Sequence, residues 1–479
     1  MKTKPFRYQS KGAYLLKRRK GRCLLADEMG LGKSIQSLMY GIRAGLFPII
    51  IVCPASLKWN WENEVSTHFG LHSVILEGRK PPRINRRLTS PDIIIINYDI
   101  LINWVPWLLS LNPCLLIFDE AHYCSNPSAK RTRAVKKLAK SIKHVIGLTG
   151  TPLINRPSEL WPVLQIIRPD IYKKFRPFAD KYCAPRLTKW GWEYKGARNL
   201  PMLHQELRDN LMVRRLKSQV LKELPKNRQI ILPVDLSRMK EYKKAEHDFI
   251  EWVGREKGLA KARKAKKAEE LSKTSYLKQL AAELKMTAIV EWIQNFLDSS
   301  DSKLIVFGVH HNVLEPLFNK FRRQSVLING KTPTKKRRRY VKMIQTDPKT
   351  RIIFGNMRAA GVGLNLTKPD TTLFTEIPWT PVDINQCIAR SVRIGQEKET
   401  TAYFMVARNT IEERLWSIVQ RKQSTFDAAI DGKDVKLTKS IYDDLIKEYY
   451  DAADQRPVKK SRHTNKRRRP ARPRRLGSV

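Results

Sequence analysis

Residues that could bind a nucleoside triphosphate stand near the start of the chain. The apolar run Cys23-Leu24-Leu25-Ala26 leads into Asp27-Glu28-Met29-Gly30-Leu31-Gly32-Lys33-Ser34. Glycines in such a turn let backbone N–H groups approach phosphate oxygens, and the helix that comes next adds partial positive charge at its N-terminus. The lysine can reach the β- and γ-phosphates, and the serine hydroxyl can ligate Mg²⁺. Because the strict pattern has glycine where Asp27 stands, this stretch alone also fits an ordinary helix-starting turn.

Two adjacent acids, Asp119 and Glu120, follow a second apolar run at residues 115–118. Carboxylates at the end of a buried strand are costly unless a cation or a reaction requires them. Asp119 is therefore expected to hold Mg²⁺, and Glu120 to orient and deprotonate an attacking water. The phosphate loop and the acid pair occur in the expected order, which predicts that the chain binds and hydrolyses a nucleotide.

The charge of the chain predicts a polyanionic partner. The 479 residues contain 92 Lys and Arg against 45 Asp and Glu, a net charge of +47. Nucleic acid fits this excess best, and an anionic membrane surface is the weaker alternative. No apolar stretch approaches the roughly 18 to 20 residues that span a bilayer. The six cysteines are scattered without a C-x-x-C spacing, so an intracellular protein with neither zinc nor disulfides is expected.

Short, continuously apolar runs separated by helical segments predict an α/β fold with parallel sheets flanked by helices. One set of runs ends near residue 148, and a second set begins at residue 304. Only the first set carries a phosphate loop, so two lobes should share one nucleotide cleft. The expected regions are a first lobe at 1–235, a helical insertion at 236–300, a second lobe at 301–432 and a disordered basic tail at 433–479.

With these motifs the chain resembles the Swi/Snf-type ATPases of helicase superfamily two, over roughly residues 5 to 425. Tyr8-Gln9 resembles the adenine-recognising Q motif, and an aspartate at position 27 is what this family shows. Cys53-Pro54-Ala55-Ser56-Leu57 with Trp59-Asn60-Trp61-Glu62 resembles motif Ia, and Leu148-Thr149-Gly150-Thr151-Pro152 resembles motif III. The resemblance implies two RecA-like lobes that use ATP with Mg²⁺.

In the second lobe, Ala360-Gly361-Val362-Gly363-Leu364-Asn365-Leu366 resembles motif V. Pro378-Trp379-Thr380-Pro381 with Gln386, Arg390, Arg393 and Gly395-Gln396 resembles motif VI. Closure of the lobes is expected to bring Arg390 and Arg393 onto the γ-phosphate, an effect of about 10³ to 10⁵ in rate. Ile388-Ala389 and Val392 depart from the usual acidic pair and histidine of motif VI, which affects the expected coupling between the lobes rather than the arginines.

The expected site has four groups of residues. Lys33, Glu120, Arg390 and Arg393 are assigned to catalysis, and Ser34 with Asp119 to the metal. The nucleotide-binding group is Gln9, Asp27, Glu28, Met29, Gly30, Leu31, Gly32, Lys33 and Ser34. The resemblance implies coupling roles for His122, Thr149, Gly150, Thr151, Gly361, Gly363, Trp379 and Gln386. Contacts to the DNA backbone are expected from Ser56, Lys58, Lys331 and Thr332.

Within the family, Trp190-Gly191-Trp192 and Arg214-Arg215-Leu216-Lys217 most resemble the annealing-helicase branch. The resulting hypothesis is a monomeric, intracellular, DNA-dependent ATPase that moves on duplex or branched DNA with little base specificity, in a bacterial or phage nucleoid or in a nucleus. A strand-separating DNA or RNA helicase remains an alternative. So does a basic nucleic-acid-binding protein with an inactive ATP site, and a nucleosome remodeller ranks below both.

Overall fold

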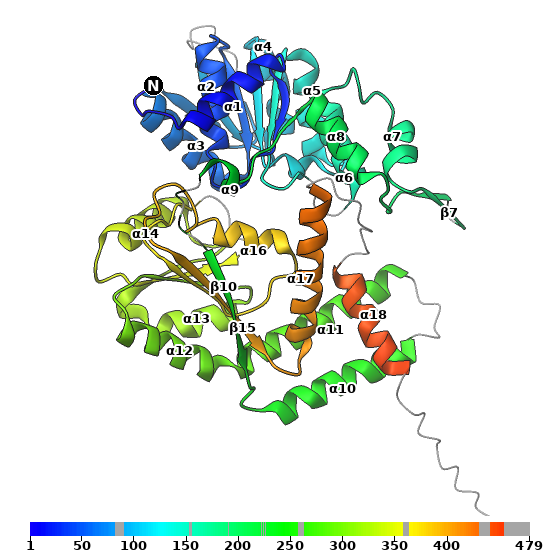
Figure 1. Ribbon diagram of the computed structural model, residues 1–479, viewed down its shortest axis with the longest axis vertical. Helices are drawn as coiled ribbons and strands as arrows, with labels where there is room; N and C mark the ends of the chain where they lie inside the picture. The colour runs from blue at the N-terminus through cyan, green and yellow to red at the C-terminus, as the bar shows by residue number, and fades with distance from the viewer. Residues whose placement is uncertain are drawn as a thin grey trace, which may run out of the picture.

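The computed structural model describes residues 1–81, 91–152, 156–189, 191–221, 223, 225, 227–256, 263–357, 364–430 and 441–454. Two α/β lobes lie one above the other, lobe 1 drawn in blue to green at the top and lobe 2 below it (Figure 1). Each lobe is built on its own parallel sheet, and the predicted fold class is confirmed.

Lobe 1 contains a sheet in the order β3-β4-β2-β5-β6-β1-β9, in which every described pairing is parallel. Its central strands are buried on both faces, as their unbroken apolar runs predict. The strands are β1 (Arg22–Leu25), β2 (Ile49–Cys53), β3 (Ser73–Ile75), β4 (Ile93–Asn97), β5 (Leu115–Asp119), β6 (His144–Leu148) and β9 (Met212–Val213).

Helices cover both faces of this sheet. One face packs on α1 (Arg7–Arg18), α2 (Lys33–Arg43) and α3 (Lys58–Glu64). The other packs on α4 (Leu101–Ser110), α5 (Lys130–Ser141), α6 (Pro157–Ile167), α7 (Phe175–Tyr182) and α8 (Leu200–Asn210). Short elements complete the lobe, namely η1 (Ala55–Leu57), η2 (Val65–Phe69), η3 (Ala121–Cys124), α9 (Lys217–Val220) and the antiparallel hairpin of β7 (Arg186–Thr188) and β8 (Gly191–Glu193).

Lobe 2 contains a parallel sheet in the order β10-β15-β14-β11-β13-β12. Its strands are β10 (Asn227–Val234), β11 (Leu304–Gly308), β12 (Ser325–Ile328), β13 (Ile352–Asn356), β14 (Thr371–Phe374) and β15 (Thr400–Ala407). The helices are α10 (Met239–Glu256), α11 (Arg263–Leu284), α12 (Met286–Ser299), α13 (His311–Lys320), α14 (Thr334–Thr346), α16 (Pro381–Ile388), α17 (Ile411–Ile430) and α18 (Ile441–Asp454), with the single turn η4 (Arg322–Gln324).

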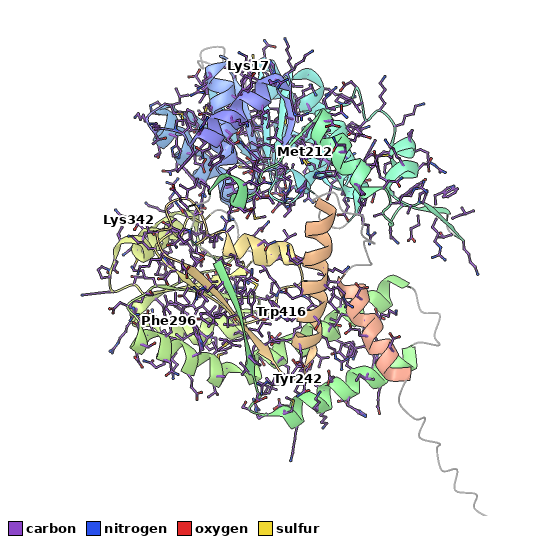
Figure 2. All side chains as sticks on the ribbon, viewed as in Figure 1. Lys17, Met212, Tyr242, Phe296, Lys342 and Trp416 are labelled. Atoms are coloured by element: carbon purple, nitrogen blue, oxygen red, sulfur yellow. The ribbon has the colours of Figure 1, made fainter. Side chains whose placement is uncertain are left out.

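The predicted helical insertion packs on lobe 2. Tyr242 of α10 is fully buried, and its hydroxyl accepts a hydrogen bond from the backbone N–H of Ile411 in α17 at 2.7 Å (Figure 2). Helix α17 also contacts α8 of lobe 1, so it runs between the two lobes. Among the described residues, no helix combines the length and apolar character that crossing a membrane requires.

Two expected boundaries differ from the structure. Residues 227–234, assigned to the first lobe, form β10 at the edge of the second sheet, parallel to β15. Residues 441–454, assigned to the disordered tail, form α18, whose Leu445 and Tyr449 are fully buried. The apolar spacing Ile441, Leu445, Ile446 and Tyr449 is helical, but the strong positive charge of the adjacent C-terminal residues masks it. The remaining tail, residues 455–479, lies outside the described part of the chain.

The buried Lys278 of α11 gives a first prediction. Its ammonium donates to the Ile377 carbonyl at 2.8 Å and lies 4.3 Å from the Trp379 ring centroid, and burial lowers its pKa to about 8. Between about pH 8 and pH 10.5 the unfolded chain therefore binds more protons at this lysine than the folded chain does. The contribution of Lys278 to the free energy of unfolding should rise by about 1.4 kcal/mol per pH unit in this window.

The measurement compares urea unfolding of the wild type and Lys278→Met at about pH 7.5 and about pH 9.5. Tyrosines and cysteines that titrate in the same pH range contribute equally to both proteins, so their contribution drops out of the difference. The free energy of unfolding of the wild type, relative to that of the variant, should be higher at about pH 9.5 than at about pH 7.5. A stability difference that does not depend on pH would contradict the assignment.

Candidate active site

The parallel order of β5, β6 and β1 places three of the predicted motifs at one edge of the lobe 1 sheet. Strand β1 leads into the phosphate loop, β5 ends at Asp119, and β6 leads into Thr149. Carboxyl ends of parallel strands are where open α/β sheets bind ligands, because the loops converge there.

The phosphate loop reaches α2 through left-handed backbone. Gly30 has φ +88° and Gly32, the residue that caps α2, has φ +66°. This left-handed backbone favours glycine at position 32, where a Cβ atom would also crowd Nε2 of Gln9. This close approach joins the loop to the predicted adenine-recognising Gln9. The Gln9 Oε1 atom accepts a hydrogen bond from the Phe6 N–H at 3.0 Å, and Nε2 is buried without a hydrogen-bond partner.

Asp27 was predicted to bind nucleotide, but its carboxylate is committed to lobe 1. It is fully buried, forms an ion pair with Arg215 and accepts a hydrogen bond from Gln36 at 3.0 Å. Arg215 also lies 5.6 Å from the Tyr8 ring centroid. Asp27, which stands where the usual pattern has glycine, therefore ties the phosphate loop to Arg215, which follows β9.

Lys33 lies over the loop and beside the acid pair. Its ammonium donates to the carbonyls of Asp27 at 2.9 Å and Glu28 at 3.3 Å. Burial lowers the pKa of Lys33, and the neighbouring Glu120 and Asp27 carboxylates oppose this change. Other loop residues bond elsewhere: the Leu31 carbonyl accepts from the Tyr8 hydroxyl at 3.2 Å, and the Glu28 carboxylate accepts from the Lys217 backbone N–H at 2.7 Å.

The Asp119 carboxylate is held by two donors. The Trp61 indole N–H donates to Oδ2 at 3.0 Å, and the Glu120 backbone N–H donates to Oδ1 at 2.9 Å. Burial and the adjacent Glu120 carboxylate raise the pKa of Asp119 to about 7. Two acids enclosed together resist ionising together, which is the electrostatic condition that a bound cation relieves.

Glu120 is positioned by strained backbone. It has φ +50°, which is uncommon outside glycine and is found where function requires a particular side-chain direction. Its Oε2 atom lies 3.3 Å from Nδ1 of His122, yet neither atom has a hydrogen-bond partner. Burial lowers the pKa of His122 to about 4, so this imidazole is neutral at pH 7. Burial also raises the pKa of Glu120, which suits a general base.

A cavity of about 130 Å³ joins these groups to lobe 2. Arg390 and Arg393, which follow α16, enter it from the second lobe and donate to the Leu364 carbonyl at 3.3 and 3.4 Å. Burial and Arg393 lower the pKa of Arg390 to about 10, so its guanidinium stays protonated at pH 7. The predicted residues that line this cavity are Met29, Gly30, Gly32, Lys33, Ser34, Asp119, Glu120, Arg390 and Arg393.

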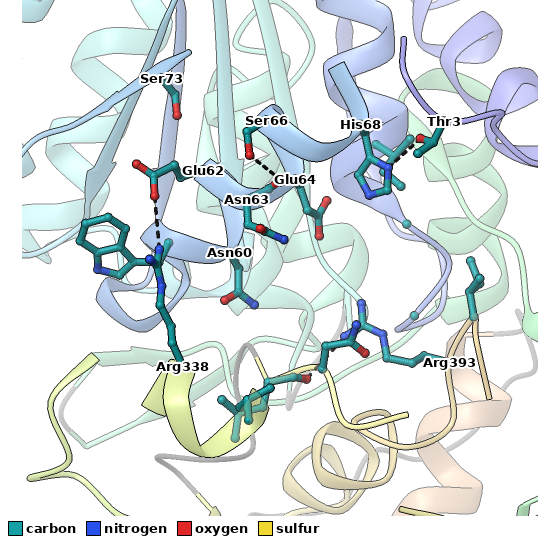
Figure 3. A pocket seen from close by; sticks show the side chains of 18 of the residues that line it. Thr3, Asn60, Glu62, Asn63, Glu64, Ser66, His68, Ser73, Arg338 and Arg393 are labelled. Carbon is teal, nitrogen blue, oxygen red and sulfur yellow. Dashed lines mark hydrogen bonds and ion pairs between the residues drawn. The ribbon is translucent and has the colours of Figure 1, made fainter. Parts of the chain in front are cut away.

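A larger cleft of about 900 Å³ opens beside this cavity and also lies between the lobes (Figure 3). Gln9 lines it together with α3 of lobe 1 and α14 of lobe 2. The lobes also touch directly, because Lys217 of lobe 1 donates to the Val392 carbonyl of lobe 2 at 2.9 Å. In this arrangement the two lobes are therefore in direct contact around the predicted nucleotide site.

The predicted coupling residues occupy two places. In lobe 1, the Thr149 hydroxyl donates to the Thr151 carbonyl and accepts from the Thr151 N–H, both at 3.1 Å. A Cβ atom at Gly150 would crowd the Met29 side chain of the phosphate loop. In lobe 2, the Gln386 carbonyl accepts from Nε of Arg390 at 2.9 Å, and Trp379 contacts Lys278. Gly361 and Gly363 lie outside the described residues.

The expected DNA contacts divide into two kinds. Ser56 and Lys331 are exposed, and Thr332 closes a turn by bonding to Asn329 at 3.0 Å. Lys58 does not fit its expected role, because its side chain is only 10% exposed and donates to the Leu76 carbonyl at 3.2 Å inside lobe 1. Lys58 is the first residue of α3 and lies three positions before the buried Trp61, so both side chains lie on the face of the helix that packs on lobe 1.

Sequence reasoning missed three residues that the structure brings to the site. Trp61 contacts Asp119, Glu64 lines the cavity beside Arg393, and Lys217 bridges the lobes. Trp61 belongs to the stretch that resembles motif Ia, and Lys217 to the stretch Arg214-Arg215-Leu216-Lys217. Nothing in the spacing of either stretch indicates a contact with a residue more than fifty positions away. For Glu64, its place three residues after Trp61 on a short helix was the available signal.

The fold and the site define a two-lobed α/β protein with a shared inter-lobe cavity. The SNF2-related domain model matches residues 8–288, and the helicase conserved C-terminal domain model matches residues 285–395. The chain belongs to the SNF2-related family, and the resemblance drawn from its motifs is confirmed.

Curated relatives agree with this assignment. The chain is 33% identical over 429 residues to a SWI/SNF-related matrix-associated actin-dependent regulator of chromatin subfamily A-like protein 1 homolog of Caenorhabditis elegans, covering 87% of this chain and 60% of that protein. It is 30% identical over 459 residues to the DNA annealing helicase and endonuclease ZRANB3 of Mus musculus, covering 91% of this chain and 42% of that protein. The chain thus spans only part of the length of these relatives. Among solved structures, the Sulfolobus solfataricus SWI2/SNF2 ATPase core in complex with dsDNA aligns with 24% identity and a TM-score of 0.41, over 90% of this chain and 94% of that one.

Proposed function

We propose that the protein is a DNA-dependent ATPase that translocates on double-stranded DNA and anneals or remodels branched DNA. The observation that carries this proposal is the shared cavity, in which Lys33, Ser34 and the acid pair of lobe 1 meet Arg390 and Arg393 of lobe 2. A site divided between two lobes makes hydrolysis depend on how the lobes are arranged, which is what a motor requires.

The donor set of the cavity fits Mg²⁺ with ATP. The Ser34 hydroxyl and the Asp119 carboxylate are oxygen ligands of the kind that Mg²⁺ prefers, and both residues line the same cavity. The raised pKa of Asp119 beside Glu120 supports this fit, because a cation between the two acids would favour their ionised forms. When bound, the ion supplies charge neutralisation to the phosphates.

Each of these side chains has a separate role in hydrolysis. Lys33 binds the phosphates by leaving the loop carbonyls that hold its ammonium. Glu120 orients the attacking water and accepts its proton, with the neutral His122 beside it. Arg390 and Arg393 stabilise charge on the transferring phosphoryl group when the lobes close. The Gln9 Nε2 donor, buried without a partner, is available to an acceptor on the adenine edge.

The net charge of +47 and the relatives named as annealing helicases support DNA as the partner. Contacts to phosphate position a protein without reading sequence, so little base specificity is expected. A monomer is consistent with this cleft, because a single chain supplies both of its sides. The protein is expected to act wherever the DNA of the cell lies.

The decisive experiment measures ATP hydrolysis with duplex DNA, single strands, forks and RNA, using wild type and Lys33→Ala. Stimulation by duplex or forked DNA that disappears in Lys33→Ala supports the proposal. Stimulation mainly by single strands or RNA favours a strand-separating helicase. No hydrolysis with any nucleic acid favours a binding protein with an inactive site.

DNA affinity should fall steeply with salt, because each neutralised phosphate releases a counterion. The logarithm of the association constant should change by about −0.9 per contacted phosphate for each unit of log salt concentration on duplex DNA. For about six to ten contacts this is a loss of roughly 10³ to 10⁵ between 50 and 200 mM salt. Fluorescence anisotropy with a labelled duplex gives the slope, and an affinity insensitive to salt would contradict binding through the phosphate backbone.

A further inference from the structure

Helix α3 makes contacts in three directions within seven residues. Trp61 faces the acid pair of lobe 1, Trp59 and Glu62 face α14 of lobe 2, and Glu64 lines the cavity with Arg393. The close view of the larger cleft shows α3 above α14, with Glu62 and Arg338 reaching toward each other (Figure 3).

The inward contact fixes the orientation of Asp119. Trp61 is only 3% exposed, so its ring has no room to rotate, and its single N–H donor is aimed at Oδ2 over 3.0 Å. With the Glu120 N–H on Oδ1, each carboxylate oxygen holds one hydrogen bond and keeps a second acceptor direction. Such partners behind a metal-binding carboxylate determine how well it is presented.

The outward contact belongs to the other lobe. The Arg338 guanidinium lies 4.4 Å from the Trp59 ring centroid, and its Nη2 atom lies 3.2 Å from Oε2 of Glu62. Arg338 is on α14, so this contact exists only when the lobes are arranged as here. Glu64, two residues beyond Glu62, opposes the burial that lowers the pKa of Arg393, which is a second link from α3 to lobe 2.

We propose that α3 couples closure of the lobes to the acid pair: Trp61 is a positioning residue for Asp119, and Arg338 docked on Trp59 and Glu62 sets the helix that carries Trp61. This inference rests on the proposed function, since it assigns to α3 the link between lobe movement and hydrolysis. Hydrolysis is then favoured in the arrangement where Arg338 is docked, in which Arg390 and Arg393 of lobe 2 also line the cavity.

The first test replaces Trp61 with phenylalanine, which keeps the ring and removes the donor. Partners that orient a metal ligand are typically worth 10- to 100-fold in metal affinity. Binding of a fluorescent ADP analogue should require about tenfold more Mg²⁺ in Trp61→Phe than in the wild type, while binding without Mg²⁺ stays unchanged. The matched control is Trp104→Phe, because Trp104 is equally buried in lobe 1 and donates to the Gly78 carbonyl at 3.1 Å, away from the acid pair.

The second test is a double-mutant cycle on DNA-stimulated kcat. Arg338→Ala alone should lower kcat by about threefold to tenfold, the range for a partly exposed ion pair with a cation–π contact. Combined with Trp61→Phe, it should add little, because both changes act through the same helix. Arg339→Ala, on the neighbouring position of α14, is the control and should leave kcat unchanged.

Two results would overturn the inference. One is a Mg²⁺ requirement in Trp61→Phe equal to that of Trp104→Phe, with both variants folded by circular dichroism. The other is a cycle in which the two effects on kcat simply multiply. The binding test involves no turnover, so it decides the role of Trp61 even if the nucleic-acid panel rejects a DNA-stimulated ATPase.

Discussion

Arg393→Ala should lower the kcat of DNA-stimulated ATP hydrolysis by about 10³ to 10⁵, the range for loss of an arginine that stabilises a transferring phosphoryl group. Arg393 reaches the cavity from lobe 2, whereas Lys33 and the acid pair reach it from lobe 1. Because the charge that it stabilises develops in the transition state, the effect should fall on kcat and leave nucleotide affinity nearly unchanged. Arg390→Ala should behave in the same way.

Steady-state hydrolysis and binding of a fluorescent nucleotide separate the two effects. Arg393→Lys keeps a positive charge but loses the planar fork, so it should recover only part of the rate. Arg408→Ala is a matched control on lobe 2, since Arg408 is half exposed and pairs with the exposed Asp235. A kcat for Arg393→Ala within tenfold of the wild type would remove the arginine from the reaction.

Lys33→Ala should abolish measurable turnover, with a loss of at least about 10² to 10³ in kcat, the range for removal of a single preorganised donor. The phosphate loop holds the lysine ammonium ready beside Glu120 and Asp119. DNA binding should remain largely intact, because this side chain is enclosed between the loop and the acid pair.

Hydrolysis by phosphate release and DNA binding by anisotropy test this prediction on the same preparation. Lys17→Ala, an exposed lysine on α1, is the control for loss of a positive charge from lobe 1 (Figure 2). Normal hydrolysis by Lys33→Ala would mean that the shared cavity is not the ATP site.

Much of the fold was predictable because its signals are local. Unbroken runs such as Ile49–Cys53 and Ile93–Asn97 are buried at every position, as strands covered by helices on both faces must be. The phosphate loop and the Asp119–Glu120 pair lie at the carboxyl ends of β1 and β5, as expected, because each directly follows a short apolar run. Their roles in binding and hydrolysis stay predictions.

Residues whose roles depend on distant partners were predicted less well. Lys58 belongs to a recognised motif and was expected to reach DNA, yet its ammonium is held by the Leu76 carbonyl. Asp27 was expected to bind nucleotide, yet Arg215, nearly two hundred residues away, holds its carboxylate. In both cases burial creates a requirement for a partner, and sequence spacing does not say which group meets it.

The sequence by itself indicated the family and the parallel sheets, and it predicted which residues bind phosphate, hold a metal ion and activate water, because residue type and near spacing carry those signals. Only the tertiary structure decided that Arg390 and Arg393 face Lys33 and Glu120 across one cavity, and that α3 connects Asp119 with Arg338. These contacts join segments between about 60 and 360 residues apart, and such distances are set by how helices and sheets pack, which local patterns do not encode.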